Sequence, residues 1–401
     1  MRRRVVITGV GAVSPLGVGA RTLVDRWQRG VSGIENGLGR CDEFEPTSFL
    51  SRKEAHRTDR FTQLAIGASH EALEQAGWAG GCPYDPDRAG CVMGTGIGGV
   101  ETILGEHDKM TERGAKALSP FGVPMMMSNA AAGALAMRYG LAGPNWGVVS
   151  ACAASAHALG SAVRLVQMGE ADAVLAGGAE AALTDMTIGG FGRMGALSRV
   201  GISRPFDARR DGFVVGEGAG ALVLEEAGAA AARGAQPLAE VLGYGATADA
   251  YHLTAPEPGG IGAARAITRA LDEAGLAPEA VDYVNAHGTS TPLNDRAETD
   301  ALKLSLGAHA KRVPVSSLKS AIGHLLGAGG AVEAAATVLT LRDRVAPPTL
   351  NWEEAEEGLD LDYVPGGARP LRDRANGLGS VAITNSFGFG GHNAVLCIAA
   401  A

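Results

Sequence analysis

The sequence of 401 residues has few aromatic side chains, no closely paired cysteines and no long hydrophobic run. Its five cysteines are odd in number and widely spaced without a Cys-x-x-Cys pair, which argues against a zinc ribbon or a disulfide scaffold and favours reduced thiols. No apolar run reaches the roughly 18 residues of a membrane-spanning helix, and residues 5–7 are too few for a signal-peptide core. We therefore expect a cytoplasmic protein without a membrane partner.

The sequence also lacks an excess of positive charge, with 35 Lys and Arg residues against 43 Asp and Glu residues. The formal net charge is −8, which gives no electrostatic reason to expect nucleic acid or an anionic membrane as a partner. In contrast, 46% of the residues are hydrophobic and 59 are glycine, so the chain can bury a large core in which backbone layers pack closely. The length is suited to two or three domains or to one large double-layered unit.

Short apolar runs alternate with stretches of helical periodicity along the chain. In the first half we expect strands at 4–7, 89–93, 173–177 and 213–225 and helices at 61–76, 121–136 and 156–168. In the second half we expect strands at 238–242, 281–285, 381–385 and 394–398 and helices at 262–274, 297–306 and 329–341. This alternation predicts an α/β fold with parallel or mixed sheets in two similar halves. The Ala, Gly and Arg composition at 228–236 marks their junction, which divides the chain into 1–235 and 236–401.

Two glycine-rich stretches invite a nucleotide-binding interpretation that their residues do not support. Residues 9–15 lack the third glycine of a dinucleotide fingerprint and contain Pro15 where the phosphate-binding helix should run, so we expect a tight turn. Residues 94–99 lack the Gly-Lys-Ser/Thr ending of a P-loop. We expect this second stretch to let backbone lie close to a packed neighbour.

Cys152 stands at a predicted turn between a short buried strand and a helix. The unpaired N–H groups and the positive end of such a helix favour a thiolate over a thiol. Alanines on both sides of Cys152 leave space for a substrate to reach the sulfur. These features favour a nucleophile, and the alternative is an inert buried cysteine, a common state of free thiols.

Three segments of the second half, at 285–292, 316–324 and 385–393, share one design: a strand end followed by a polar residue among Gly, Ser and Thr. Loops after strands cluster at one edge of an α/β sheet, so we expect these segments to meet at Cys152. His287 and His324 would then supply hydrogen bonding or acid–base help to a nucleophile. His157 is nearer in sequence, but its helical spacing turns it away from the cysteine. We expect the following histidines on the surface: His56, His70, His107, His252 and His309.

Taken together, these residues resemble the beta-ketoacyl-[acyl-carrier-protein] synthases, condensing enzymes with the thiolase fold. The resemblance covers nearly the whole chain and rests on motifs at 8–11, 150–153, 204–207, 211–213, 287–291, 319–324 and 385–391. It implies a thiolase-like α/β fold of two similar halves stacked as αβαβα layers, the first half carrying the nucleophile. The elongating (KAS II-like) type fits better than the initiating type, which has one His and one Asn where this chain has two histidines.

The resemblance also implies a reaction. An acyltransferase of this family would hold an acyl chain on Cys152 as a thioester, with the N–H groups of Cys152 and Phe389 as an oxyanion hole. His287 and His324 would hold the carbonyl of a malonyl thioester while carbon dioxide is lost. The resulting carbanion attacks the acyl thioester and gives a beta-ketoacyl product in fatty-acid or polyketide synthesis. No metal or other cofactor is implied beyond the phosphopantetheine arm of acyl carrier protein.

Further residues match supporting positions of the family. Lys319 matches a structural lysine paired with acids, and the matching acids are Asp295, Glu298 and Glu333. Phe389 matches a gate that swings to admit the extender between flanking glycines. The implied substrate-binding residues are Thr289 and Thr291 for the pantetheine arm, Ile97 for the acyl pocket, and Phe387. The implied partners are acyl carrier protein and either a second copy of the chain or a related chain-length-factor-like subunit.

Some features depart from the family pattern, and two other functions compete. The stretch 44–51 is shorter than expected, Asn294 stands where glycine is common, and His392 stands where threonine is frequent. Residues 125–127 lie in a region that in the family's dimer contributes to the neighbour's acyl pocket. A non-catalytic chain-length factor would lack the active cysteine. A thiolase would need a second cysteine in the last glycine loop, and Cys397 lies outside it.

Overall fold

The computed structural model describes residues 2–372 and 379–401. Its largest sheet runs through five strands from each half of the chain. The first half contributes, in spatial order, β1 (Val5–Ser14), β9 (Gly218–Glu226), β7 (Ala173–Glu180), β5 (Ala89–Gly94) and β6 (Asn145–Val148). The second half contributes β10 (Ala239–Ala248), β16 (His392–Ala400), β15 (Val381–Gly388), β11 (Tyr283–Asn285) and β12 (Val315–Ser316). The short strand β2 (Gly17–Val18) of the first half pairs with β1 off this path.

The two sets of strands have the same topology. In each set the first strand pairs antiparallel with the second, and the second pairs antiparallel with the third. The last two pairings of each set are parallel. The sets join where the start of β1 pairs with the start of β10. This repeated order confirms the predicted two similar halves.

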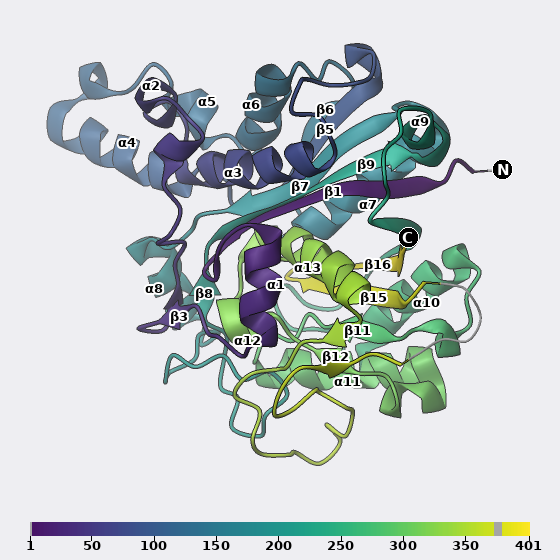
Figure 1. The fold of residues 1–401 in the computed structure, drawn as a ribbon. Helices are drawn as coiled ribbons and strands as arrows, with labels where there is room; N and C mark the ends of the chain where they lie inside the picture. Colours follow the sequence, from purple (N-terminus) through teal and green to yellow (C-terminus); the bar gives the residue numbers. More distant parts are fainter. Residues whose placement is uncertain (1, 373–378) are drawn as a thin grey trace.

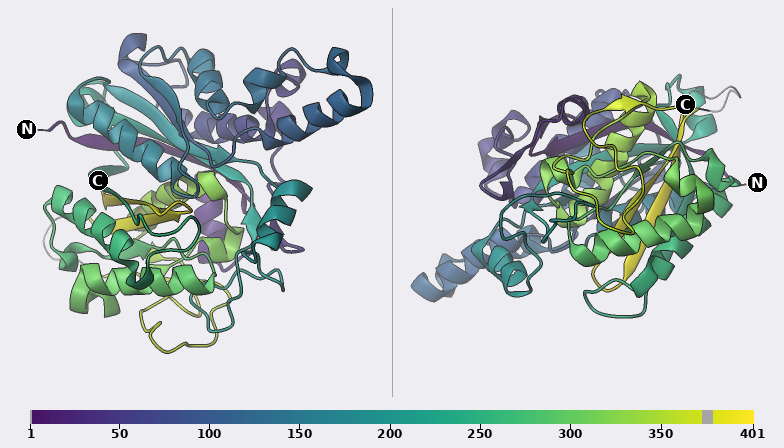
Figure 2. Two further views of the ribbon diagram at one scale, coloured as in Figure 1. Left: turned by 180° about the vertical axis from the view of Figure 1, so that it is seen from behind. Right: turned by 90° about the horizontal axis from the view of Figure 1, so that it is seen from below.

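Helices form layers outside and between the two sets of strands (Figures 1 and 2). The helices α7 (Ala154–Met168) and α13 (Gly329–Asp343) lie between them and pack on each other. The helices α3 (Arg60–Gln75) and α6 (Ala130–Tyr139) cover the outer face of the first set, and α10 (Ile261–Ala274) and α11 (Pro292–Leu306) cover that of the second. Every residue of α13 from Gly329 to Leu341 is buried, as a helix between two sheets requires. The layers follow the expected αβαβα order.

Shorter elements complete the described chain. The remaining helices are α1 (Ala20–Gln28), α2 (Arg52–Ala55), α4 (Val100–Arg113), α5 (Gly122–Met126), α8 (Asp185–Arg193), α9 (Ala227–Ala232) and α12 (Lys319–Ile322). The short strands are β2 (Gly17–Val18), β3 (Ile34–Glu35), β4 (Leu38–Gly39), β8 (Val215–Gly216), β13 (Val345–Ala346) and β14 (Arg369–Pro370). Within residues 2–372 and 379–401, no helix has the length and apolarity needed to cross a membrane.

The predicted tight turn at residues 9–15 is wrong, because β1 continues through them to Ser14. Gly9 and Gly11 are needed for close packing instead: a Cβ atom at Gly9 would clash with the carbonyl oxygen of Ala72, and one at Gly11 with that of Ala68, both on α3. Glycine in a strand often marks such a close approach of another backbone. The chain turns after Ser14, where β1 pairs with β2.

Two other predictions on elements need correction. The helix expected at 121–136 is two helices, α5 and α6, separated by extended backbone at Met127. Ser128 and Asn129 follow, and both residue types are poor in helix interiors. The strand before Cys152 is not buried: β6 is the edge strand of the sheet, and Asn145 and Trp146 are exposed.

Candidate active site

The three polar segments and Cys152 meet at one cavity of about 460 Å³. Because β11 is parallel to both β12 and β15, the loops that follow these strands leave the sheet at one edge. The cavity is lined by the predicted residues Ile97, Cys152, His287, Thr289, Thr291, Glu298, His324, Phe387 and Phe389. The predicted convergence is confirmed, while Lys319, Asp295 and Glu333 are buried behind the lining.

Cys152 lies in a strained turn between β6 and α7. Ala151 has a positive φ of 50°, and Cys152 directly precedes Ala153, the N-cap of α7. The turn packs tightly on the end of β15, since a Cβ atom at Gly388 would lie 3.0 Å from the Cys152 nitrogen. A side chain at position 388 would therefore crowd the backbone of the cysteine turn.

Burial raises the pKa of the Cys152 thiol to about 11. The charge of Lys319 and the N–H groups of Phe389 and Cys152 act in the opposite direction, and Glu180 adds to the increase. The predicted resting thiolate is therefore wrong, because desolvation of the sulfur outweighs the helix end. At neutral pH Cys152 is a thiol beside two backbone donors.

The two cavity histidines are held in one tautomer by their neighbours. The Nδ1 atom of His324 accepts the N–H of Leu326 at 3.2 Å, and the Nδ1 atom of His287 lies 3.4 Å from Nζ of Lys319, which can only donate. In both rings the proton is therefore on Nε2. Burial lowers the pKa of both histidines well below the usual value, and the Lys319 charge adds to this effect. The rings are neutral donors with centroids 5.4 Å apart.

Lys319 pairs with a single one of the three predicted acids. Its Nζ forms a short contact with Glu333, and both side chains are 1% exposed. Burial raises the pKa of the Glu333 carboxyl although Lys319 opposes this. The predicted pairing with Glu298 and Asp295 is wrong. Glu298 accepts the N–H groups of His287 and Gly288 at 2.8 and 2.7 Å and fixes the histidine loop instead.

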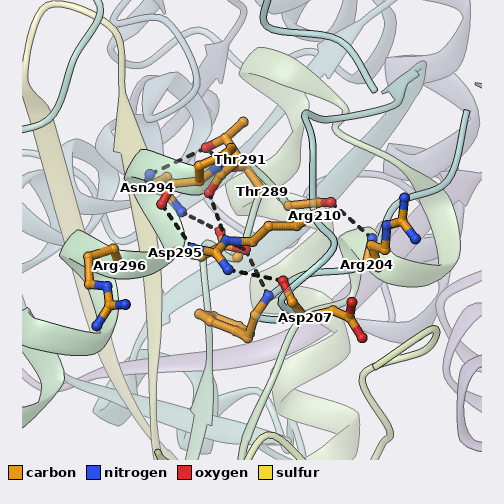
Figure 3. Close-up of polar contacts among 12 residues, drawn as sticks. Arg204, Asp207, Arg210, Thr289, Thr291, Asn294, Asp295 and Arg296 are labelled. Carbon is orange, nitrogen blue, oxygen red and sulfur yellow. Dashed lines mark hydrogen bonds and ion pairs between the residues drawn. The ribbon is translucent and has the colours of Figure 1, made fainter. Parts of the chain in front are cut away.

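Asp295 belongs to a network behind the Thr289–Thr291 wall (Figure 3). Its carboxylate accepts the N–H of Phe206 at 2.8 Å and lies 3.7 Å from the guanidinium of Arg210. The two threonine hydroxyls are 2.9 Å apart, and Thr291 also caps α11. These contacts pin the start of α11 to the segment that contains Arg210, because Asp295 lies on the first turn of this helix.

Sequence reasoning assigned no role to Arg210, although its side chain is 3% exposed. Its guanidinium donates to the carbonyl oxygens of Asp207 and Pro292 at 3.0 and 3.1 Å, and it pairs with Glu356. A signal was available, since Arg210 stands between two of the motifs that carried the resemblance. Arg210 is therefore the cation that pairs with Asp295, in place of the predicted Lys319.

The conserved-family model for the beta-ketoacyl synthase N-terminal domain matches residues 35–230, and that for the C-terminal domain matches residues 238–353. The chain belongs to the beta-ketoacyl synthase family. A relative from Synechocystis sp. named 3-oxoacyl-[acyl-carrier-protein] synthase 2 is 47% identical over 98% of this chain and 97% of its own.

Solved structures agree with this assignment. A beta-ketoacyl synthase from Burkholderia phymatum is 35% identical with a TM-score of 0.91, and both chains are covered completely. The ishigamide ketosynthase/chain length factor is 32% identical with a TM-score of 0.90 and the same coverage. The chain therefore has the fold that its sequence motifs implied.

Aromatic rings support the histidines of this beta-ketoacyl synthase. Phe213 packs edge-on against His324 at 5.3 Å between centroids, and Phe387 packs similarly against His287 at 5.8 Å. Phe213 also lines the cavity, a role that the sequence did not predict. Edge-to-face packing holds each imidazole plane while leaving its Nε2–H free for a ligand.

The other histidines of the beta-ketoacyl synthase take no part in the cavity. His157 turns away from it, as predicted, and its Nδ1 lies 2.7 Å from the hydroxyl of Ser150. The exposed ones are His56, His70, His107 and His252, as expected. His309 is a correction: it is buried, with Nε2 2.7 Å from the carbonyl oxygen of Val281, because the 3₁₀ turn after α11 packs on the turn Pro278–Ala280 that precedes β11.

Proposed function

We propose that this beta-ketoacyl synthase condenses an acyl chain held on Cys152 with a malonyl group carried by acyl carrier protein. Carbon dioxide is released and a beta-ketoacyl chain remains on the carrier. The observation that carries the proposal is the meeting of one thiol and two neutral Nε2–H donors in a single cavity. The first half, 1–235, supplies the nucleophile, and the second half, 236–401, supplies both histidines and Lys319.

The first step transfers the acyl chain to the enzyme. The Cys152 sulfur attacks the carbonyl carbon of the acyl thioester, and the thiol proton passes to the departing pantetheine sulfur. Negative charge develops on the carbonyl oxygen, where the N–H groups of Cys152 and Phe389 act as donors. The high pKa of the thiol means that proton loss accompanies attack, so no free thiolate accumulates at neutral pH.

The second step removes carboxylate from the extender. The Nε2–H groups of His287 and His324 donate to the malonyl thioester oxygen, which gains charge as the bond to carbon dioxide breaks. One such donor in a dry site is commonly worth about 3 kcal/mol of transition-state stabilisation. The enolate carbon then attacks the Cys152 thioester, and the cysteine sulfur leaves and regains a proton.

The remaining predicted residues position the two substrates. The hydroxyls of Thr289 and Thr291 line the cavity and can hydrogen-bond the amide groups of the pantetheine arm. Ile97 stands at the acyl side. Phe389 acts as the gate, because Gly390 and Gly391 have positive φ values of 83° and 72° and can absorb a backbone change.

Acyl carrier protein is the proposed macromolecular partner, as in the name of the Synechocystis relative. A second copy of the chain is the proposed subunit partner. The edge strand β6 has one neighbouring strand and carries an exposed Trp146. Val149, which directly follows β6, is exposed, and so is Met127, whose neighbour Ser128 packs against Gly147 of this strand. A chain-length-factor-like subunit is the second candidate, because one solved relative is named a ketosynthase/chain length factor. A cytoplasmic location completes the proposal.

The test is a condensation assay with the purified protein, malonyl-carrier and a series of acyl-carriers, with product masses measured. We expect carbon dioxide release and a product two carbons longer than the acyl donor. Complete inactivity with every acyl donor would contradict a self-sufficient enzyme. Activity gained only after a related subunit is added would favour the second candidate.

A further inference from the structure

Glu180, the last residue of β7, is a completely buried carboxylate with no role in the proposed chemistry. It accepts the N–H groups of Gly96, Ile97 and Gly327 at 2.6, 3.1 and 3.0 Å, and the hydroxyl of Thr95 at 2.9 Å. Burial raises the pKa of the Glu180 carboxyl, and all of these partners donate, so they oppose this increase and stabilise the carboxylate form. Among the described residues no arginine or lysine forms an ion pair with it.

The donors come from two segments that pack directly on each other beside the cavity, since a Cβ atom at Gly327 would clash with the nitrogen of Gly96. Ile97 lies in the loop that follows β5 and lines the cavity, at the side that the proposed function assigns to the acyl chain. Gly327 directly follows Leu326, whose N–H donates to Nδ1 of His324 and so fixes the tautomer of this ring. One carboxylate therefore holds both the acyl-side loop and the turn that orients a decarboxylation donor.

The packing around Glu180 leaves little freedom for either segment. A Cβ atom at Gly96 would lie 2.7 Å from Oε2 of Glu180, and one at Gly327 would lie 2.8 Å from the same oxygen. These distances are shorter than side chains tolerate, so the glycines approach the carboxylate with bare backbone. Neither segment can shift without losing hydrogen bonds to a fully desolvated charge, which is costly.

We propose that Glu180 is a positioning residue that couples the acyl-binding loop at Ile97 to His324, so that both substrates meet in register. The proposal rests on the proposed function, because it assigns His324 to the malonyl group. Glu180 touches no reacting atom. It acts through Leu326 and Gly327 on the direction of the His324 Nε2–H.

The same carboxylate acts on the nucleophile through space. Burial is the main cause that raises the pKa of Cys152, Glu180 adds to it, and Lys319 opposes it. These two are the charged groups that act on the thiol, since His287 and His324 are neutral. Replacing Glu180 by a neutral isostere is therefore expected to lower the pKa of Cys152.

The test compares Glu180→Gln with a matched control, Glu225→Gln. Glu225 is also fully buried on a strand of the first half, where it accepts hydrogen bonds from Thr8, Tyr84 and Arg233 and lines no part of the cavity. In each variant an NH₂ group replaces one oxygen and faces former donors. Both proteins lose one buried carboxylate, and only one of them loses the link to His324.

For Glu180→Gln we expect kcat for decarboxylation of malonyl-carrier to fall about tenfold or more, with KM changed by less than about threefold. Alkylation of Cys152 by iodoacetamide is expected to be faster at neutral pH, and its pH profile to move to lower pH. For Glu225→Gln we expect a lower melting temperature and an unchanged alkylation profile. If Glu180→Gln does not fold, Thr95→Val, which removes one donor to the carboxylate, is expected to lower kcat about threefold.

The inference is overturned if Glu180→Gln decarboxylates and alkylates as the wild type does. It is equally overturned if Glu180→Gln and Glu225→Gln change the decarboxylation kcat and the Cys152 alkylation rate to the same extent. Glu180 would then have only a structural role. A wild-type protein that neither decarboxylates malonyl-carrier nor accepts acyl groups would overturn the proposed function itself, a result distinguishable from both.

Discussion

Each reactive side chain in the cavity takes its protonation state from one or two immediate neighbours. Lys319 and the N–H of Leu326 each occupy an Nδ1 atom, which places the proton of both imidazoles on Nε2. Burial keeps the rings neutral and the Cys152 sulfur protonated. The histidines are therefore suited to donate hydrogen bonds and not to remove the cysteine proton.

Alanine in place of His324 is expected to lower malonyl decarboxylation by a factor of about 10²–10³, because one donor to the developing enolate is lost. Acylation of Cys152 by acyl-carrier should change little, since its donors are backbone N–H groups. The two half-reactions are measured separately by carbon dioxide release and by intact mass. His107→Ala, on the exposed face of α4, is the control and should behave as wild type. Equal loss of both half-reactions would contradict the assigned role.

Methionine in place of Lys319 leaves Glu333 buried without its cation, so the pKa of Glu333 rises further. A carboxyl whose pKa is raised by folding binds its proton more tightly in the native state. Native stability is then greatest below the unfolded pKa and is lost as pH rises toward the folded pKa. We expect the melting temperature of Lys319→Met to fall more steeply than that of wild type between about pH 5 and pH 8. Calorimetry across this range measures the slope.

The double variant Lys319→Met/Glu333→Gln removes the titrating group and should flatten the slope. A slope that persists in the double variant would assign the titration to another residue. The buried pair matters for function because Lys319 also donates to His287.

At the residue scale, the sequence was sufficient to predict site residues that lie in recognisable loops. It was insufficient to predict which charged side chains pair across the core. Cys152 and both histidines follow strand ends among small residues, and such loops meet at a sheet edge. The partner of Asp295 could not be derived, because it depends on where α11 meets the segment of Arg210. Glu180 carries no local signal, since a glutamate at a strand end is more often exposed.

At the scale of elements, the glycines at 9–15 were interpreted as a turn, whereas Gly9 and Gly11 lie in a strand that contacts the backbone of a helix. Residues 9–15 resemble a loop by composition, yet Gly9 and Gly11 lie on the same face of β1, and α3 packs against that face. Their spacing of two was the available signal for a strand. The helices with clear periodicity, such as α3 and α10, agree with prediction to within one residue at either end.

Alanine at Gly9 is expected to destabilise the protein by about 1–3 kcal/mol, because its Cβ meets the carbonyl oxygen of Ala72 and forces β1 from α3. Gly105 on α4 is the matched control. A Cβ atom there meets nothing, so Gly105→Ala should stabilise by about 0.5–1 kcal/mol through helix propensity. Chemical denaturation measures both. Equal effects of the two substitutions would contradict the packing described for β1.

At the scale of the whole molecule, the active site exists only where the two halves meet. Cys152 comes from the first half and both histidines from the second, so neither half holds a complete site. The layered order was predictable from the alternation of strands and helices. The exposure of β6 was not predictable, because a short apolar run has the same pattern in a central strand and in an edge strand.

We expect the protein to sediment as a dimer, and Trp146→Glu on β6 to sediment as a monomer, because a charge would be buried at the proposed subunit contact. Leu304→Glu, on the exposed face of α11 in the other half, is the control and should remain dimeric. Analytical ultracentrifugation separates the two states. A wild-type protein that is active and monomeric would contradict the proposed homodimer.

The most direct measurement of the central claim is the intact mass of the protein after incubation with acyl-carrier. We predict a mass increase equal to one acyl group, located on the peptide that contains Cys152 and absent in Cys152→Ala. Addition of malonyl-carrier should then remove this mass while carbon dioxide and a longer chain on the carrier appear together. An acyl group that forms on another residue, or that persists when malonyl-carrier is added, would contradict the account.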